Sequence, residues 1–257
     1  MDCRQSLLVV SIDLEPRTNT TSLQHQREVR SAGSDLMRLF NKYQIPATWA
    51  VAAPGQDPKT DPILASNVSH EIAIQGDAVW ATEKVNRASF AGHLSESVAR
   101  AADRGVMVHS LVGLNVKGSH TDLLVKNAIT TLRSARPGSH RSVRWIEPHQ
   151  VRFGVWDLPE SYRFPGPKTW LSEITKMGLQ RGVKTASARK RPLHVVVDAE
   201  KVASSKASCL KTLEGVLECA AQYRHSNQLR TETLTDSVEL ITTRPAVSSA
   251  RSILRAA

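Results

Sequence analysis

The stretch SLLVVSIDLE at residues 6–15 decides the fold class. Residues 6–13 are mostly apolar on both faces, which is typical of a parallel strand that helices cover. Asp13 and Glu15 stand two positions apart at its carboxyl end, so they point to the same side. No glycine-rich turn follows, which excludes a nucleotide-binding loop and the dinucleotide-binding fingerprint. Carboxylates at this end of a parallel strand usually serve a site, because strand ends form the open face of the fold.

Short runs rich in β-branched residues recur along the chain and alternate with helical patterns. The runs that we predict as further strands are 47–51, 71–76, 106–113, 143–148 and 193–198. Such alternation indicates parallel strands that are linked by crossover helices. We expect one α/β domain over residues 1–257, with about six or seven parallel strands in an open doubly wound sheet or a closed barrel.

Apolar residues at helical spacing predict the connecting helices. One helix ends before Pro46, another covers 95–105 between capping serines and Gly105, and the longest covers 208–225. Two apolar stripes mark helices in the first and the fourth connection: Val29, Ala32, Leu36, Leu39, Phe40 and Tyr43, and then Val125, Ala128, Ile129 and Leu132. We expect the weakest order at about 155–192, which is rich in Pro, Gly and Lys, and in the tail after Pro245.

Composition limits the compartment and the class of protein. The 257 residues are 40% hydrophobic, enough for a large buried core. Three cysteines without a C-x-x-C pair indicate neither a disulfide framework nor a zinc knuckle, which fits a reducing compartment. No apolar run reaches the length that crosses a bilayer, so we expect a cytoplasmic protein without a membrane partner.

The positive charge is concentrated in one segment. The net charge is +10, and residues 176–191 carry six basic residues and no acidic one. A solvated loop in a generally basic protein is the more common use of such a run. A patch that attracts an anionic polymer is the alternative, and no specific nucleic-acid partner is predicted.

Three motifs in order carry a resemblance to a known family. SIDLE at 11–15, FNKYQIPATWAV at 40–51 and SHEIAIQG at 69–76 resemble the opening of the polysaccharide deacetylase (NodB-homology) family. The resemblance implies a distorted (β/α) barrel of about seven parallel strands, in a family that removes acetyl groups from N-acetylated sugars. LHVVVDAEKV at 193–202 is similar to the family's late strand. The segment 151–166 matches the family's Arg- and Pro-containing motif only loosely, so no role passes to Arg163.

The family's chemistry uses a divalent metal held by one Asp and two His, a neighbouring Asp as base and a late His as acid. On the matched motifs the base falls on Asp13, and the acid falls on Asp198. The metal-ligand positions fall on Leu14, Gln75 and Val79. Leucine and valine donate nothing, and a neutral amide is a poor zinc ligand. The resemblance therefore implies a former zinc site without its ligands, and we expect no zinc cofactor.

Two alternatives use the remaining polar residues of the same region. Glu15 and Asp77 could join Asp13 and Asp198 in an oxygen-ligated site for magnesium, calcium or manganese. Gln75, Asp77 and Trp80 are candidates for substrate binding, because sugar rings stack on indoles, although core packing is the commoner use of a tryptophan. We expect Asp13, Gln75, Asp77 and Asp198 to converge at one end of the barrel.

Three functions stay open at the level of sequence. The first is a catalytically degenerate, deacetylase-like protein of carbohydrate metabolism that retains a carbohydrate-binding cleft. The second is an active hydrolase of the amide C–N bond of an N-acetylated sugar, metal-independent or with a rebuilt site, in which Asp13 and Asp198 transfer protons. The third is a module that binds an anionic polymer through its basic surface. Loss of both metal histidines favours the first.

Overall fold

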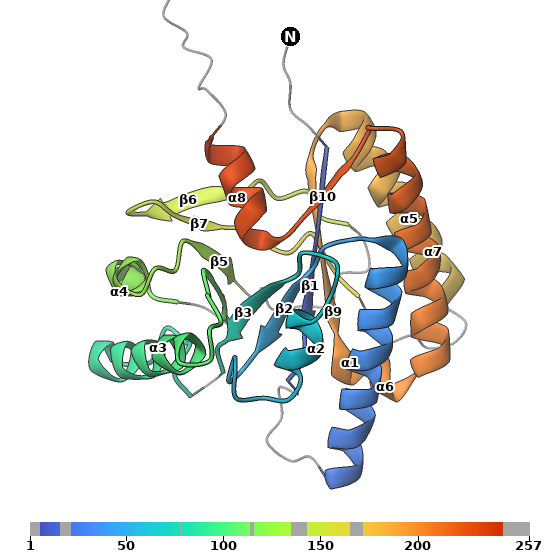
Figure 1. Cartoon of the computed structure of the whole chain (residues 1–257). Helices are drawn as coiled ribbons and strands as arrows, with labels where there is room; N and C mark the ends of the chain where they lie inside the picture. Colours follow the sequence, from blue (N-terminus) through green and yellow to red (C-terminus); the bar gives the residue numbers. More distant parts are fainter. Residues whose placement is uncertain are drawn as a thin grey trace, which may run out of the picture.

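The computed structural model describes residues 6–15, 22–77, 79–113, 116–134, 143–164 and 172–243 (Figure 1). Within them lies one ten-stranded sheet of order β6-β7-β5-β4-β3-β2-β1-β9-β8, and β10 also pairs with β1. Only the β6–β7 pair is antiparallel among the described strands. The strands are β1 (Leu7–Asp13), β2 (Thr48–Val51), β3 (Glu71–Gln75), β4 (Ser110–Gly113), β5 (Thr131–Ser134), β6 (His149–Arg152), β7 (Val155–Asp157), β8 (Tyr162–Arg163), β9 (Pro192–Asp198) and β10 (Arg230–Glu232).

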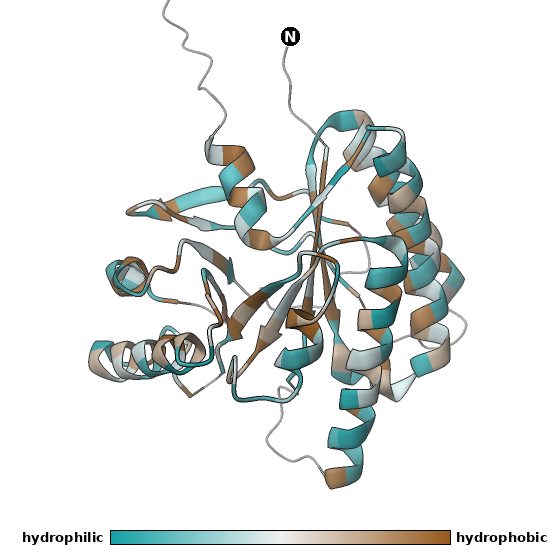
Figure 2. Ribbon diagram, viewed as in Figure 1, coloured by the Kyte–Doolittle hydropathy of each residue, from teal (hydrophilic) through white to brown (hydrophobic). Residues whose placement is uncertain are grey.

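Helices cover the outside of this sheet on two sides. Figure 1 shows α1, α7 and α5 together on one side and α3 and α4 on the other. Their outward surfaces are mainly hydrophilic, and the central strands are mainly apolar (Figure 2). The helices are α1 (Leu23–Tyr43), α2 (Thr60–Leu64), α3 (Arg87–Ala102), α4 (Thr121–Lys126), α5 (Ser172–Arg189), α6 (Ala199–Ser204), α7 (Lys206–His225) and α8 (Leu234–Thr242), with a 3-10 turn at Gly118–His120.

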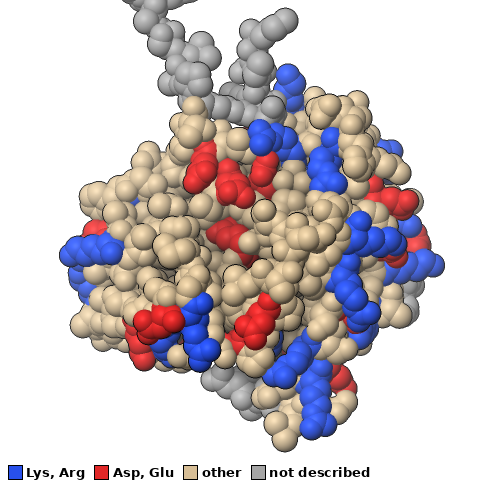
Figure 3. Space-filling model, viewed as in Figure 1, with Lys and Arg blue, Asp and Glu red and all other residues tan. Residues whose placement is uncertain are grey.

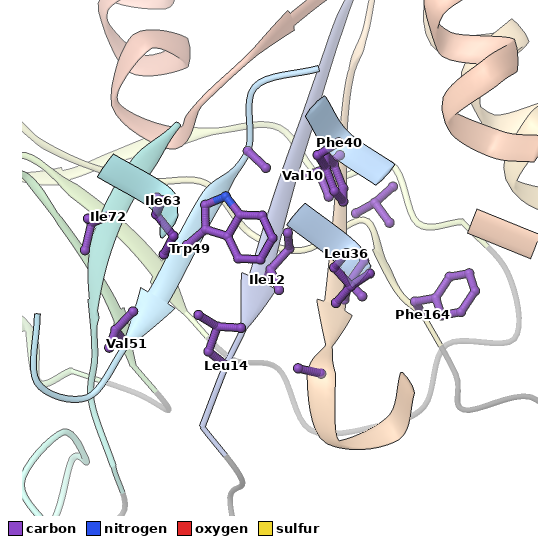
Figure 4. Close-up of a cluster of buried hydrophobic side chains, with 14 of the residues drawn as sticks. Val10, Ile12, Leu14, Leu36, Phe40, Trp49, Val51, Ile63, Ile72 and Phe164 are labelled. Atoms are coloured by element: carbon purple, nitrogen blue, oxygen red, sulfur yellow. The ribbon is translucent and has the colours of Figure 1, made fainter. Parts of the chain in front are cut away.

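Alternation along β1 separates two cores. Val10 and Ile12 face outward, against Leu36 and Phe40 of α1 and beside Trp49 of β2 (Figure 4). The alternate residues face inward and form a second cluster with α8: Leu7, Val9, Ala50, Ala73, Val112, Leu158, Leu234 and Val238. Because strand side chains alternate between faces, this division follows directly from the sequence of β1.

Helix α8 fills the inner side of the curved sheet. The backbone N–H of Leu234 donates to Thr48 Oγ1 at 2.8 Å, and the N–H of Thr235 donates to Glu71 Oε2 at 3.2 Å. The side chain of Thr233 accepts from the Asp236 N–H and caps the helix start. These bonds hold the start of α8 against the first residues of β2 and β3.

A side-chain contact reports the curvature of the sheet. Arg133 of β5 forms an ion pair with Asp13 of β1. These strands are four positions apart in the sheet order, which is about 19 Å in a flat sheet. The side chains therefore meet across a curled half-barrel, and the predicted α/β barrel class is confirmed.

Several predicted elements are wrong in the middle of the chain. Residues 143–148 form no strand. The helix predicted around Val125–Leu132 ends at Lys126, because Ala128 takes a left-handed conformation with φ of 58° that breaks the helix. Leu132 then belongs to β5, whose first three residues are all buried, as in a strand that is covered on both faces. The helix expected at 95–105 begins earlier, at Arg87, where the Asn86 side chain caps the Ser89 N–H.

The segment 155–192, for which we predict weak order, contains a regular helix among its described residues. Residues 172–189 form α5, whose Leu179, Val183 and Ala186 are fully buried. The i, i+4 and i, i+3 spacing of these three residues is a helical stripe that the Lys and Gly content concealed. The basic run 176–191 therefore lies mostly on a helix rather than in a loop. The tail after residue 245 lies outside the described residues.

The search for membrane-spanning helices gave a negative result. No helix among the described residues is both long enough and apolar enough to cross a bilayer.

Candidate functional site

Asp13 is the centre of a buried ionic cluster at the carboxyl end of β1. The residue is 1% exposed. Its Oδ1 accepts a hydrogen bond from Nη2 of Arg133, and its Oδ2 accepts one from Nη1 of Arg163 at 3.1 Å. The small inward residues Ala50 and Ala73 of the intervening strands leave interior space for the long arginine side chain. Both carboxylate oxygens are thus engaged by guanidinium groups.

The two arginines have different surroundings. Burial lowers the pKa of Arg133, and the nearby Asp13 carboxylate opposes that shift. Its Nε and Nη1 have no hydrogen-bond partner among the described residues. Arg163 also donates to Glu160 Oε2 through Nε at 3.0 Å and Nη2 at 2.6 Å. Burial acts to lower the pKa of Arg163, but the charges of Asp13 and Glu160 outweigh it and raise that pKa. The positive charges of Arg133 and Arg163 are therefore balanced by the negative charges of Asp13 and Glu160.

Asp198 is the neighbour of Asp13 on the adjacent strand. The two residues are register partners across β1 and β9, and Asp198 is 4% exposed. Its Oδ1 accepts from the backbone N–H groups of Glu200 at 3.1 Å and Lys201 at 3.4 Å, which caps α6. Burial, followed by the negative charge of Asp13, raises the pKa of Asp198. Of this pair, Asp198 is the carboxyl group suited to hold a proton.

His194 lies deeper in the barrel than Asp198. Its Nδ1 is 3.0 Å from the Leu158 carbonyl oxygen, which can only accept, so Nδ1 carries the proton. Nε2 then accepts from the Ser11 hydroxyl. Burial lowers the pKa of His194 to about 3, so the ring is neutral. A serine and a histidine in contact resemble a nucleophile and its base, but Ser11 is fully buried. The pair therefore serves packing.

The three residues that the resemblance places at metal-ligand positions do not form a zinc donor set. Leu14 packs outward against α1, where a Cβ on Gly33 would lie 3.2 Å from Leu14 Cδ2. The Gln75 amide is used by the backbone of Glu15, accepting from its N–H at 3.3 Å and donating to its carbonyl at 3.2 Å. Val79 is 66% exposed. Zinc needs about four nitrogen, sulfur or carboxylate donors, so these residues do not fit the ion.

The rebuilt oxygen site is not formed within the described residues. Glu15 Oε1 accepts from Lys59 Nζ at 2.8 Å. Asp77 is exposed, and its Oδ1 caps the backbone N–H groups of Val79 at 2.8 Å and Trp80 at 3.2 Å. Across the part of the chain that the structure describes, no group of three or more His, Cys, Asp or Glu side chains is arranged to hold a metal ion.

The predicted substrate-binding residues have separate positions. Gln75 lies at the end of β3 and contacts Glu15, two residues after the end of β1, which places it near Asp13 and Asp198 at one end of the barrel. Asp77 lies two residues beyond that strand end. Trp80 is 7% exposed and packs against Phe90, with ring centroids 5.8 Å apart, and His93, at 6.1 Å. Its indole is therefore mainly a core group.

No local sequence pattern indicates Arg133 or Glu160 as site residues. Arg133 directly follows Leu132, the last residue of the apolar stripe that predicts a helix. An arginine beside such a stripe is expected on a solvated face. Glu160 stands only three residues before Arg163, but both lie in the segment 155–192, for which the sequence predicts weak order and no local ion pair. Arg163 had one available signal, the RFPG run at 163–166, which the loose match to the family's motif left without a role.

Sequence comparisons gave no match, whereas structural comparisons did. No family model and no curated protein matches the chain. The structure is similar to a predicted polysaccharide deacetylase from Mycobacterium smegmatis, with a TM-score of 0.69, 12% identity, and coverage of 94% of this chain and 92% of that one. It is also similar to an allantoinase, with a TM-score of 0.65, 13% identity, and coverage of 95% and 93%.

A third similar structure is a family 4 carbohydrate esterase pseudoenzyme from Bacillus anthracis. The TM-score is 0.52 at 8% identity, over 91% of this chain and 66% of that one. These likenesses show that the chain has the polysaccharide deacetylase-like fold. At such low identity they show the fold alone, since one fold serves many functions.

Proposed function

We propose that this protein is a deacetylase-like protein of carbohydrate metabolism that has lost metal-dependent deacetylation and retains a carbohydrate-binding cleft. The observation that carries the proposal is the double engagement of Asp13 by Arg133 and Arg163. A general base must offer a free oxygen lone pair to the proton that it removes. Asp13 directs its oxygens to two buried guanidinium groups instead.

The donor set supports the same proposal. Leu14 and Val79 have no donor atom, and the Gln75 amide is occupied by the backbone of Glu15. We infer that the protein binds no zinc. The pseudoenzyme from Bacillus anthracis supports the idea that this fold can persist after catalysis is lost.

The cleft would lie at the carboxyl ends of β1, β3 and β9. Gln75, Asp77 and Asp198 provide polar groups at or just beyond these strand ends. Sugar hydroxyls need such fixed donors and acceptors, and ligand sites of barrels cluster at this end.

Two measurements on the purified protein test the proposal. Acetate release from an N-acetylated chito-oligosaccharide should stay at background with and without added zinc. Binding of the same oligosaccharide, measured by calorimetry, should weaken in Gln75→Ala and Asp77→Asn. The matched control is Glu96→Gln on α3, whose side chain is 61% exposed and distant from these strand ends. Efficient acetate release by the wild type would overturn the proposal.

A metal-independent hydrolase is the second candidate, and the Asp13–Asp198 pair favours it. The environments of these neighbouring carboxyl groups differ, because guanidinium groups engage Asp13 while burial raises the pKa of Asp198. In active sites, a difference in environment between two neighbouring carboxyl groups lets one act as a base and the other as an acid. This candidate predicts acetate release that resists chelation and disappears in Asp198→Asn. The first proposal predicts no release from either protein.

A further inference from the structure

A cavity lies on the outside of the barrel, away from the Asp13 cluster. It measures about 110 Å³ and lies between α1, α2 and the ends of β1 and β2. Leu14 is one of its lining residues. Because neighbouring residues of a strand face opposite sides, Leu14 faces this cavity while Asp13 faces the barrel interior. The cavity is therefore separate from the proposed carbohydrate cleft.

The floor of the cavity is apolar and already formed. Leu14, Met37, Trp49 and Ile63 line it, and each is less than 10% exposed. Figure 4 shows Leu14, Trp49 and Ile63 on the same side of the strands. Pro58 and Pro62 add two walls from the segment that leads into α2 and from the helix itself. Because these aromatic and proline groups are already fixed, binding a ligand here costs little conformational entropy of the protein.

Gly33 contributes to the space around Leu14. It stands in the interior of α1, where glycine is less favourable than alanine. A Cβ at this position would lie 3.2 Å from Leu14 Cδ2, closer than an ordinary contact. The glycine therefore allows Leu14 to lie against α1 while the cavity stays open.

The rim of the cavity carries one cation that no described residue neutralises. Arg30 lines the cavity, and the structure gives its guanidinium no ion pair or hydrogen bond with any residue that it describes. Lys59, the other lining cation, contacts Glu15 at 2.8 Å and Asp57 at 3.3 Å. An anionic group on a ligand would therefore be drawn to Arg30 rather than to Lys59.

We propose that this cavity binds a small monocyclic carboxylate. Its ring lies among Leu14, Met37 and Trp49, and its carboxylate accepts hydrogen bonds from Arg30. The size fits one ring, since an apolar protein cavity of about 150 Å³ accommodates benzene. The Met37 thioether adds a favourable contact with an aromatic ring. The inference stands independently of any activity at Asp13.

Benzoate is the probe that tests the site, and methyl NMR of the full chain is the measurement. Benzoate should shift the methyl signals of Leu14, Met37 and Ile63. Arg30→Gln should weaken benzoate binding about tenfold, because a charged hydrogen-bond partner is lost. Arg27→Gln is the matched control, an exposed arginine of the same helix that does not line the cavity, and it should leave the affinity unchanged.

Two further comparisons separate the cavity from other binding modes. Benzyl alcohol, which lacks the charge, should bind the wild type more weakly than benzoate does. In Arg30→Gln the two probes should bind with equal affinity. Gly33→Leu, which places a side chain against Leu14, should abolish binding of both probes.

Three results would overturn the inference. The first is the absence of any methyl shift with benzoate. The second is unchanged benzoate affinity in Arg30→Gln, a surface variant that should fold normally. The third is a shift confined to Val112 and Val196, the inward-facing register partners of Arg133 and Arg163, which would place the carboxylate inside the barrel.

Discussion

At the scale of single residues, the most consequential group is Arg133. It places a cation in the fully buried interior, where Asp13 is its hydrogen-bonded counter-ion. A buried ion pair often adds little net stability, because removing both charges from water costs about as much as their attraction returns. Removing only one partner is far more costly. The stability of the fold should therefore depend on Arg133 as long as Asp13 is buried beside it.

Arg133→Met should lower the free energy of unfolding by about 3–5 kcal/mol, because Asp13 then keeps a buried charge with one guanidinium partner instead of two. Chemical denaturation at neutral pH measures the change. Arg38→Met is the matched control, since Arg38 pairs with Asp35 but its side chain is 78% exposed. The control should change stability by less than about 1 kcal/mol. Equal effects of the two substitutions would contradict the assignment of Arg133 to a buried network.

His194 should make the protein sensitive to acid. Burial lowers its pKa from 6.5 to about 3, so the unfolded chain takes up a proton at this site between these pH values and the folded chain does not. Stability should therefore be full above pH 6.5 and fall as the pH drops towards 3, by a few kcal/mol in total from this residue. His70, whose burial lowers its pKa to about 4, adds to the same slope.

The substitution His194→Asn tests this origin of the acid sensitivity. The variant should show a flatter dependence of the denaturation midpoint on pH between 6.5 and 4 than the wild type. His225→Asn, at an exposed position, should keep the slope of the wild type. A wild-type slope in His194→Asn would exclude the buried imidazole as its cause.

Zinc should leave the melting temperature of the wild type unchanged. A ligand that binds only the folded state raises the melting temperature, and Leu14, Gln75 and Val79 provide no donor set for this ion. Differential scanning fluorimetry with low zinc concentrations and with a chelator measures the effect. A rise of several degrees that the chelator reverses would contradict the prediction.

At the scale of elements, the sequence of α8 does not indicate that this helix packs in the inner core of the sheet. Leu234 and Val238 are buried in the inner core beside Leu7 and Val9 of β1. A short helix of nine residues is marginal by itself, so its stability comes from this packing. The helix packs against the inward-facing side chains of the sheet and fills space that the strand side chains do not fill.

Leu234→Ala should lower the free energy of unfolding by about 2–5 kcal/mol, because it removes a fully buried side chain from the inner core. Leu240→Ala on the same helix is the control, since Leu240 is only partly buried. Its cost should be clearly smaller in the same denaturation experiment. A larger cost for Leu240 would mean that α8 does not fill the barrel interior as described.

At the scale of the whole molecule, the charge is basic but distributed. Figure 3 shows many Lys and Arg side chains on the side where α1 and α7 lie, with Asp and Glu among them. Some of these cations are neutralised, as Lys42 is by Glu214 at 2.6 Å. Attraction to an anionic polymer therefore depends on the cations without partners rather than on the net charge of +10.

Retention on immobilised heparin should depend on salt and on α5. Arg181 and Lys184 lie on the exposed face of this helix. Their double substitution by Gln should shift elution to lower salt, because fewer cations contact the polymer. The control Arg38→Gln removes a cation that Asp35 already neutralises and should elute nearly as the wild type does. Equal shifts would mean that net charge alone controls retention.

The sequence by itself determined the class of fold and the position of its first strand. SLLVVSID is apolar on both faces, and local alternation of strands and helices requires a sheet covered by helices. The stripe of α1 and the long helix α7 were predicted for the same reason, because helical periodicity is a local property. The family resemblance placed the metal-ligand positions on residues 14, 75 and 79, and residue chemistry then predicted that these residues bind no zinc.

Tertiary structure alone decided the surroundings of Asp13. Its arginine partners lie 120 and 150 residues away in the chain, and no local pattern records such a contact. The curl of the sheet brings β5 and β8 to β1, and burial then makes ionic partners necessary, because an isolated charge in the interior is too costly. The same curl encloses Asp198, and this burial raises the pKa of its carboxyl group.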